Sequence, residues 1–423
     1  MSVGPLSNTS AQALFKEKYR DLVPALYEAE VNFCSMVEKR DVEKIGPRGL
    51  IIAKKLKPGG QVRTWNPDGG DMGRGTGPAF EKASVTTIPL LVALESTRAI
   101  QWNTASNDIA IKNAVQDLLK DGTSEYKAQM DRYYFGDGTG VLATVSSGGT
   151  GLTPVMTAPV GTRWLRQGQR YTVYPTGLGA PLGTVTVDSI DHVTYTATIT
   201  STVPGGSASG DKFLPDGVTG ASPTWFWGLA YHNSSASTGL WMNMARATYP
   251  QIRSIAVDAG SGAMVPTHFR VLKSRMELFR DGAFKKGNWM VIWNPAQRQA
   301  YEELALLINV IQKQASARSG IEMLYNPDQF EVDGIPTFTA PNQNPSRVDV
   351  INLENFFRVE TVPFGLYTVD DISTFPIYGA SGGLASSEVT YLAGLSQLCC
   401  DDPGLNGSIG SLAIPTGYKE FGT

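Results

Sequence analysis

Cysteine and histidine are scarce in this sequence. Only three of each occur among 423 residues. Cys34, Cys399 and Cys400 cannot form a disulfide framework, because the last two are adjacent and a bridge between chain neighbours is strained. A fold held together by disulfides is therefore excluded, and the sequence predicts a protein of a reducing compartment.

Long hydrophobic runs and a strong net charge are also missing. Residues 1–10 do not combine a basic region with an apolar core, and no later stretch approaches the roughly 18 uncharged apolar residues of a membrane span. The formal net charge is only −3, so no strong overall field could hold nucleic acid through its phosphates. We therefore expect a soluble, cytosolic protein with no membrane partner.

The residues that are present suit a folded protein with many turns. At 42% hydrophobic and 18% charged, the chain is long and apolar enough for two or three cores. Its 45 glycines and 25 prolines show no short period, which excludes a collagen-like or low-complexity polymer. Charge is segregated along the chain: residues 321–423 carry 13 acidic residues against Arg347, Arg358 and Lys419, a local charge of −10, which leaves +7 on residues 1–320.

Residues 49–89 form a long, glycine-rich and basic segment. Alternation at Gln61–Trp65 and Ser84–Leu90 predicts a two-stranded ribbon around a glycine-rich tip. Such a ribbon is marginally stable alone, so we expect it to lie on another surface. Three interpretations stay open: the ribbon is solvated, it meets DNA phosphates, or it pairs with the acidic region of a neighbouring copy and sets the registry between subunits. The candidate intersubunit contacts are Lys54, Lys55, Lys57, Arg63, Trp65 and Arg74.

Two helices are expected in the first third of the chain. Residues 11–40 have an apolar face interrupted near Pro24, which predicts an interrupted helix. From a cap at residue 106 or 107 to Phe135, apolar residues recur every three or four positions, which predicts one helix of about 29 residues, roughly 43 Å long. Gly136–Gly140 are suited to left-handed turn conformations and precede a predicted strand at Val141–Val145.

A β-rich segment follows at residues 159–228 and looks inserted. Between Gly183 and Val203, 14 of 21 residues are Thr, Val, Ile or Tyr. Because these residues favour pleated strands, the segment predicts a small β-domain.

Mixed helix and strand return after residue 228. Thr267 precedes a predicted helix that ends at Gly282. A buried strand is predicted at Trp289–Trp293, and it leads into a helix capped by Asn294 with Pro295 as its first residue.

One pattern suggests catalysis. Gly379–Gly383 matches the Gly-x-Ser-x-Gly elbow, in which a nucleophilic serine sits beside a histidine base. That arrangement needs a histidine after the serine, whereas here all three precede Ser381, so a loop is the favoured interpretation and a serine hydrolase the minor one. The histidines also lack metal-ligand spacing; they are His192, His232 and His268. We predict no catalytic, cofactor-binding or metal site, and a protein that is not an enzyme.

The stretch Tyr133–Gly140, YYFGDGTG, ends the long predicted helix; Leu142 and Ala143 follow it, and Gly239–Pro250 lies further on. With these motifs, the order of N-terminal helix, basic ribbon, long helix and mixed segments resembles the major capsid proteins of tailed bacteriophages with the Hong Kong 97 fold. The resemblance covers most of the chain in layout, and the motifs that carry it are short.

The resemblance implies an α+β fold with named parts. They are an N-terminal arm and helix at 1–48, an extended β-ribbon loop at 49–100, the spine helix and start of a peripheral domain at 101–158, a β-rich insertion domain at 159–228, peripheral domain at 229–261, an axial domain at 262–344, and a return to the peripheral domain with C-terminal strands at 345–423.

The resemblance also implies a function. A major capsid subunit assembles with itself into pentamers and hexamers of an icosahedral shell, in the host bacterial cytoplasm, and resides in the virion. Its implied partners are scaffolding, portal and decoration proteins, and double-stranded DNA held without sequence specificity. The alternatives are another virion structural or binding protein, and the serine hydrolase that would use Ser381.

Overall fold

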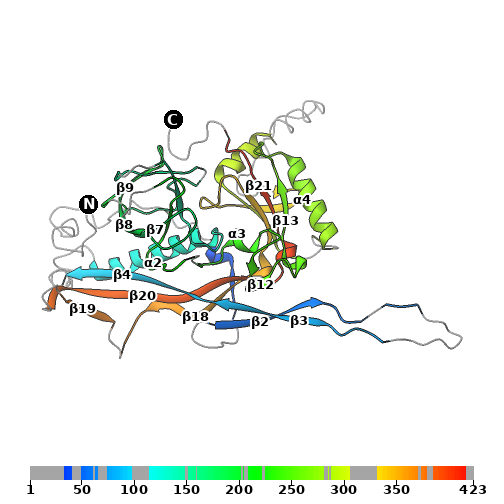
Figure 1. Ribbon diagram of the computed structural model, residues 1–423, viewed down its shortest axis with the longest axis horizontal. Helices are drawn as coiled ribbons and strands as arrows, with labels where there is room; N and C mark the ends of the chain where they lie inside the picture. Colours follow the sequence, from blue (N-terminus) through cyan, green and yellow to red (C-terminus); the bar gives the residue numbers. More distant parts are fainter. Residues whose placement is uncertain are drawn as a thin grey trace, which may run out of the picture.

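The computed structural model shows a mixed α and β subunit in which strands predominate (Figure 1). A long sheet, a closed barrel and a second sheet pack together, and a two-stranded ribbon projects away from them. The expected α+β class is confirmed. The structure describes residues 33–40, 49–60, 62–64, 74–97, 114–147, 151–158, 160–201, 203, 208–221, 224–280, 284, 287–304, 331–369, 373–378 and 384–415.

The long sheet is built around the 17-residue strand β20 (Leu384–Cys400). Strand β4 pairs along one edge of β20, and β18 followed by β19 pairs along the other, all antiparallel. The short strand β1 adds to β18 in parallel. These strands are β1 (Glu38–Lys39), β4 (Ile88–Thr97), β18 (Phe356–Leu366) and β19 (Thr374–Tyr378).

Helix α2 (Ala114–Tyr134) packs on this sheet. Gly122 permits close approach, because a Cβ at this position would lie 2.8 Å from a methyl group of Leu94 on β4. Tyr126 stacks on Phe364 of β18, with the ring centroids 3.5 Å apart. The long helix predicted up to Phe135 is confirmed over α2, and residues 106–113 lie outside the described residues.

The interrupted helix predicted over residues 11–40 is wrong where the structure describes it. A single 3-10 turn, η2 (Cys34–Met36), is followed by β1. The cause is tertiary: Phe33 is fully buried, its backbone N–H donates to Asp131 at 2.7 Å, and β1 pairs with β18. These contacts outweigh the local helical period. Residues 11–32 lie outside the described residues.

The β-rich segment folds into a closed six-stranded barrel. Two of its strands lie upstream of residue 159, where the inserted segment was expected to begin. Closure removes the free strand edges that a small open sheet would expose. In order around the barrel, the strands are β10 (Lys212–Pro215), β5 (Ala143–Ser147), β6 (Val155–Met156), β9 (Thr196–Ile199), β8 (Gly183–Asp191) and β7 (Arg170–Tyr174).

The second sheet carries helix α4 (Pro266–Phe279) against its face. The predicted strand Trp289–Trp293 is confirmed as β14, with all five residues buried. The cap after it is confirmed too, because Asn294 Oδ1 accepts from the N–H of Ala296 at 3.0 Å and the helix starts at residue 295. In order across the sheet, the strands are β13 (Ile255–Asp258), β21 (Gly407–Gly410), β17 (Val348–Asn352), β14, β16 (Ile335–Thr339) and β15 (Glu331–Val332).

Short elements join these parts. They are α3 (Leu229–His232), β11 (Leu240–Trp241), β12 (Met244–Ala245), η3 (Pro250–Ile252), η6 (Leu353–Asn355) and η7 (Pro403–Leu405).

Among the described residues, no helix has both the length and the apolar character to cross a bilayer.

The ribbon consists of β2 (Gly49–Lys57) and β3 (Ala79–Thr86), which form a two-stranded antiparallel sheet of their own. Figure 1 shows it extending well beyond the rest of the subunit. The predicted ribbon is thus confirmed, but its strands differ in detail. Residues 62–64 are not a strand, because the first strand lies upstream. The strand predicted over Ser84–Leu90 divides at Thr87, whose buried hydroxyl lies 3.0 Å from that of Thr361, so β4 continues into the long sheet instead of the ribbon.

Candidate functional site: the ribbon and its anchor

The outer part of the ribbon is basic and exposed. Lys55 and Lys57 extend from β2, and Arg63 and Arg74 lie farther toward the tip; all four are exposed. Two apolar side chains accompany them, since Val62 is fully exposed and Phe80 is 62% exposed. Aromatic and arginine side chains are enriched on surfaces that bind other proteins. Trp65 lies outside the described residues.

Lys54 differs from these residues because it is buried and bonded within its own chain. It is 9% exposed, and its Nζ donates to Asp401 Oδ1 at 2.8 Å and to the carbonyl oxygens of Cys400 and Asp401 at 3.2 Å. These bonds use all three ammonium protons. The Nζ also lies 5.9 and 6.0 Å from the ring centroids of Trp241 and Phe357, within cation–π range. Lys54 therefore fixes the ribbon to its own subunit.

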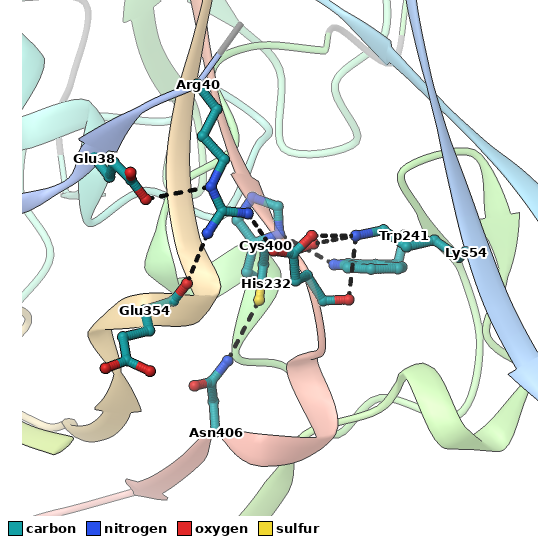
Figure 2. Close-up of polar contacts among 9 residues, drawn as sticks. Glu38, Arg40, Lys54, His232, Trp241, Glu354, Cys400 and Asn406 are labelled. Atoms are coloured by element: carbon teal, nitrogen blue, oxygen red, sulfur yellow. Dashed lines mark hydrogen bonds and ion pairs between the residues drawn. The ribbon is translucent and has the colours of Figure 1, made fainter. Parts of the chain in front are cut away.

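Asp401 also accepts from a second cation, Arg40. The Arg40 guanidinium donates to Asp401 Oδ2, to the carbonyl of Glu354 at 3.1 Å and to the Glu38 carboxylate at 3.3 Å (Figure 2). Its Cζ lies 4.5 Å from the ring centroid of Phe357. Asp401, directly after β20, thus joins the ribbon to the residue that follows β1.

The other ribbon strand is held by a neighbouring hairpin and by a tyrosine. Tyr249 Oη donates to Glu81 at 2.7 Å, and this bond lowers the pKa of Glu81 below its ordinary value. Asn243 Nδ2 donates to the backbone and hydroxyl oxygens of Ser84 at 3.0 and 2.7 Å, and the N–H of Ser84 donates to Met242. Met242 and Asn243 have φ of 47° and 63°, as the two central residues of a type I′ hairpin turn between β11 and β12 require. Both ribbon strands are therefore fixed at their base.

A buried histidine lies behind this anchor. Trp241 Nε1 donates to His232 Nδ1 at 3.0 Å, so the ring proton is on Nε2, which donates to the carbonyl of Leu398 at 3.0 Å. Burial, with nearby Arg246 and Lys54, lowers the pKa of His232 to about 3. His232 is therefore a neutral core residue whose two ring nitrogens are both hydrogen-bonded.

Charges that are segregated along the sequence meet within one subunit. Within the described residues, four ion pairs join basic residues from residues 1–320 to acidic residues of the last quarter, with N–O separations of 3.1 Å or less. They are Lys39–Glu360, Arg40–Asp401, Lys54–Asp401 and Arg280–Asp402. Folding of a single subunit thus brings part of the segregated charge together.

The glycine-rich stretch after α2 forms the predicted turn. Gly138 and Gly140 have φ of 89° and 80°, a region open to glycine. Asp137 Oδ1 accepts from the N–H and hydroxyl of Thr139 at 3.0 and 2.6 Å, as in an Asx turn. The N–H of Trp225 donates to the carbonyl of Gly138 at 2.8 Å. This turn joins α2 to the barrel and is tied to the segment that leaves the barrel.

Comparison with solved structures gives the fold a precedent. The chain aligns with a capsid subunit from the asymmetric unit of cyanophage A-1(L), with a TM-score of 0.54 and 11% identity, over 96% of this chain and 99% of the other. The chain has the fold of a phage capsid protein. Two weaker likenesses also span nearly complete chains. The capsid of a native GTA particle aligns with a TM-score of 0.49 and 9% identity, over 97% of this chain and 100% of the other. The SrpI encapsulin complex of Synechococcus elongatus aligns with a TM-score of 0.45 and 6% identity, over 100% of both chains. No family model and no curated protein sequence matches the chain.

Of the serine and histidine residues considered for catalysis or metal binding, those that the structure describes do not come together in one site. Ser381 lies outside the described residues. His192 Nδ1 lies 2.9 Å from the hydroxyl of Thr162 on the barrel, and His268 Nδ1 accepts from the N–H of Val265 at the start of α4. Within the part of the chain that the structure covers, no three His, Cys, Asp or Glu residues are grouped so as to hold a metal ion.

Sequence reasoning missed the residues that anchor the ribbon in this capsid-like fold. Arg40, Asp401, Tyr249 and Asn243 belong to four separate segments, and no local pattern joins them. Strand alternation puts Lys54 on the opposite face of β2 from Lys55 and Lys57, but the sequence does not indicate which face is buried, and in the structure it is the face of Lys54. The adjacent Cys399 and Cys400 are both buried in the core and free of disulfides.

Proposed function

We propose that this chain is the major capsid subunit of a tailed bacteriophage, and that it assembles into pentamers and hexamers of an icosahedral shell around double-stranded DNA. The observation that carries the proposal is the projecting ribbon on a capsid-like fold. A two-stranded ribbon with exposed Val62 and Phe80 leaves apolar surface and strand edges uncovered, and contact with further copies would cover them.

The outer ribbon supplies the first candidate contact. Lys55, Lys57, Arg63 and Arg74 are exposed there, with Trp65 in the same segment, and we infer that they meet acidic surface of a neighbouring copy. Complementary charge would fix the registry between subunits and speed their encounter. Lys54 is bonded to Asp401 of its own subunit, so its proposed role is to fix the base of the ribbon and not to contact the neighbouring copy.

We propose a map onto the parts of the Hong Kong 97 fold that follows the sheets of the structure, so its bounds differ from those expected from the sequence. In this proposal, β2 and β3 are the extended loop, α2 the spine helix, the long sheet with β4 the peripheral domain, the second sheet with α4 the axial domain, and the barrel with β5 and β6 the insertion domain. A net charge of −3 suits a container, since tight phosphate binding by many copies would hinder DNA packing and release. Scaffolding, portal and decoration proteins are the further partners proposed, and the virion is the proposed location.

Electron microscopy and sedimentation of the full-length chain test the proposal. We expect closed shells of megadalton mass, formed at high protein concentration or on co-expression with a scaffolding protein. Stable monomers under all of these conditions would contradict the proposal. Monodisperse rings or fibres would instead favour another virion structural protein.

A further inference from the structure

We propose that Asp401 is a positioning residue that couples the direction of the ribbon to the N-terminal strand β1. The proposal rests on the proposed function for its importance, because the direction of the ribbon matters if the ribbon must meet another subunit. The contacts that carry it lie within one subunit and can be measured without assembly.

Lys54 is buried close to the point at which β2 leaves the body. Leu56, two residues farther along, is half-buried against the core, and residues 57–60 and 62–64 toward the tip are exposed. Its ammonium holds the side chain of Asp401 and two carbonyl oxygens at the end of β20. The exposed residues of the ribbon lie beyond its contacts with the body, so a small rotation at Lys54 moves these outer residues by a larger distance.

The carboxylate of Asp401 is shared between two elements. Oδ1 accepts from Lys54 of β2, and Oδ2 accepts from Arg40 directly after β1. Arg40 is itself fixed by the carbonyl of Glu354 and by the N–H that it donates to the Arg358 carbonyl at 3.0 Å. A carboxylate held on both oxygens has a single orientation. Arg40 therefore acts on the ribbon through its bond to Asp401.

The exposure of Arg40 and Asp401 decides whether loss of Arg40 loosens or tightens the base of the ribbon. The side chains of Arg40 and Asp401 are 36% and 39% exposed, so water and salt screen the repulsion between the two cations. The geometric restraint on the carboxylate is not screened. We therefore expect loss of Arg40 to loosen Asp401 and, through it, the base of the ribbon; displacement of β1 would have the same effect.

Hydrogen exchange of the unassembled full-length subunit tests the coupling. In Asp401→Asn and in Arg40→Gln we expect the amides of residues 50–54 and 82–86 to exchange about tenfold faster, the change that corresponds to roughly 1.4 kcal/mol in a local opening equilibrium. Asp402→Asn is the matched control, because Asp402 is adjacent in sequence but pairs with Arg280 at 3.1 Å. It should leave these amides unchanged.

Each outcome decides the matter. Faster exchange in Asp401→Asn but not in Arg40→Gln would overturn the coupling, and no change in either would overturn the positioning role as well. Equally faster amide exchange in Asp402→Asn would show that the ribbon responds to any change after β20, and would also contradict the proposed coupling. Since the measurement uses single subunits, failure of the chain to form shells would contradict the proposed function and leave this result intact.

Discussion

Lys54 and Glu81 lie opposite each other in the ladder of the ribbon, yet their charged groups bond to different parts of the body. Lys54 reaches Asp401 after β20, and Glu81 accepts from Tyr249 near η3. The two strands are therefore held at the same level from two directions. Such an arrangement resists rotation of the ribbon better than a salt bridge between the pair would, because that bridge would bind the ribbon only to itself.

Removal of the buried ammonium should destabilise the subunit. Lys54→Met leaves the Cys400 and Asp401 carbonyl oxygens without their donor, and we expect a loss of about 2 kcal/mol in the free energy of unfolding. Lys55→Met, one residue along and exposed, should change it by less than about 0.5 kcal/mol. Urea unfolding of the unassembled subunit gives both values, and equal losses would show that Lys54 is not the anchor.

Charge reversal on the outer ribbon should affect assembly and not folding. In the double variant Lys55→Glu, Lys57→Glu we expect shells to be absent or to dissociate at lower salt, because both side chains are exposed and their complementary partners would be repelled. The neutral pair Lys55→Gln, Lys57→Gln should give an intermediate effect. Light scattering measures assembly and thermal unfolding checks the subunit; shells of normal yield and salt resistance in the reversed variant would refute electrostatic registry.

A methyl group at Gly228 should disrupt the junction between α2 and the barrel. A Cβ at Gly228 would lie 2.5 Å from the backbone nitrogen and oxygen of Gly136, and backbone cannot move aside cheaply. We expect Gly228→Ala to cost on the order of 3 kcal/mol in the free energy of unfolding. Gly177→Ala, where a Cβ meets nothing within 4 Å, is the control and should be close to neutral. A Gly228→Ala subunit as stable as the control would contradict the packing described at this turn.

His232 should make the subunit less stable in acid. Its pKa is about 3 in the folded state against an ordinary value of 6.5, so below pH 6.5 the unfolded chain binds a proton that the folded chain does not. Stability from this residue is complete above pH 6.5 and is lost as the pH falls toward 3. Between pH 6 and 4 we expect the free energy of unfolding to fall by about 1.4 kcal/mol per pH unit more in the wild type than in His232→Gln. Parallel pH dependences in the two proteins would contradict the buried, neutral state of His232.

The sequence predicted those features that depend on neighbours in the chain. Trp289–Trp293 is a strand because five consecutive large apolar residues suit an element buried on both faces, and Asn294 with Pro295 marks the next helix by local capping chemistry. The turn at Gly136–Gly140 follows from the conformational freedom of glycine. The ribbon was predicted as a unit, but its first strand was placed at the wrong residues, since residues 62–64 are not a strand and the first strand lies upstream at Gly49–Lys57.

The anchor of the ribbon could not be predicted in the same way. Lys54 and Asp401 are separated by 347 positions, and basic residues near Lys54 look alike in sequence. Only the pairing of β4 and β18 with β20 brings the end of β20 to the base of the ribbon. The helical period of residues 33–40 was likewise overruled by burial of Phe33 and by strand pairing with β18.

By itself, the sequence determined the absence of a disulfide framework, the projecting ribbon, the long helix, the turn after it and the motifs that resemble phage capsid proteins. Each of these depends on residue type, on a short period or on backbone freedom, all of which act over a few positions. The tertiary structure alone decided that the barrel closes, that basic residues of 1–320 pair with acidic residues of the last quarter within one subunit, and that Lys54 belongs to the body while Lys55 and Lys57 face outward. Those outcomes depend on which distant segments meet, and the free energy of such contacts is shared over the whole fold.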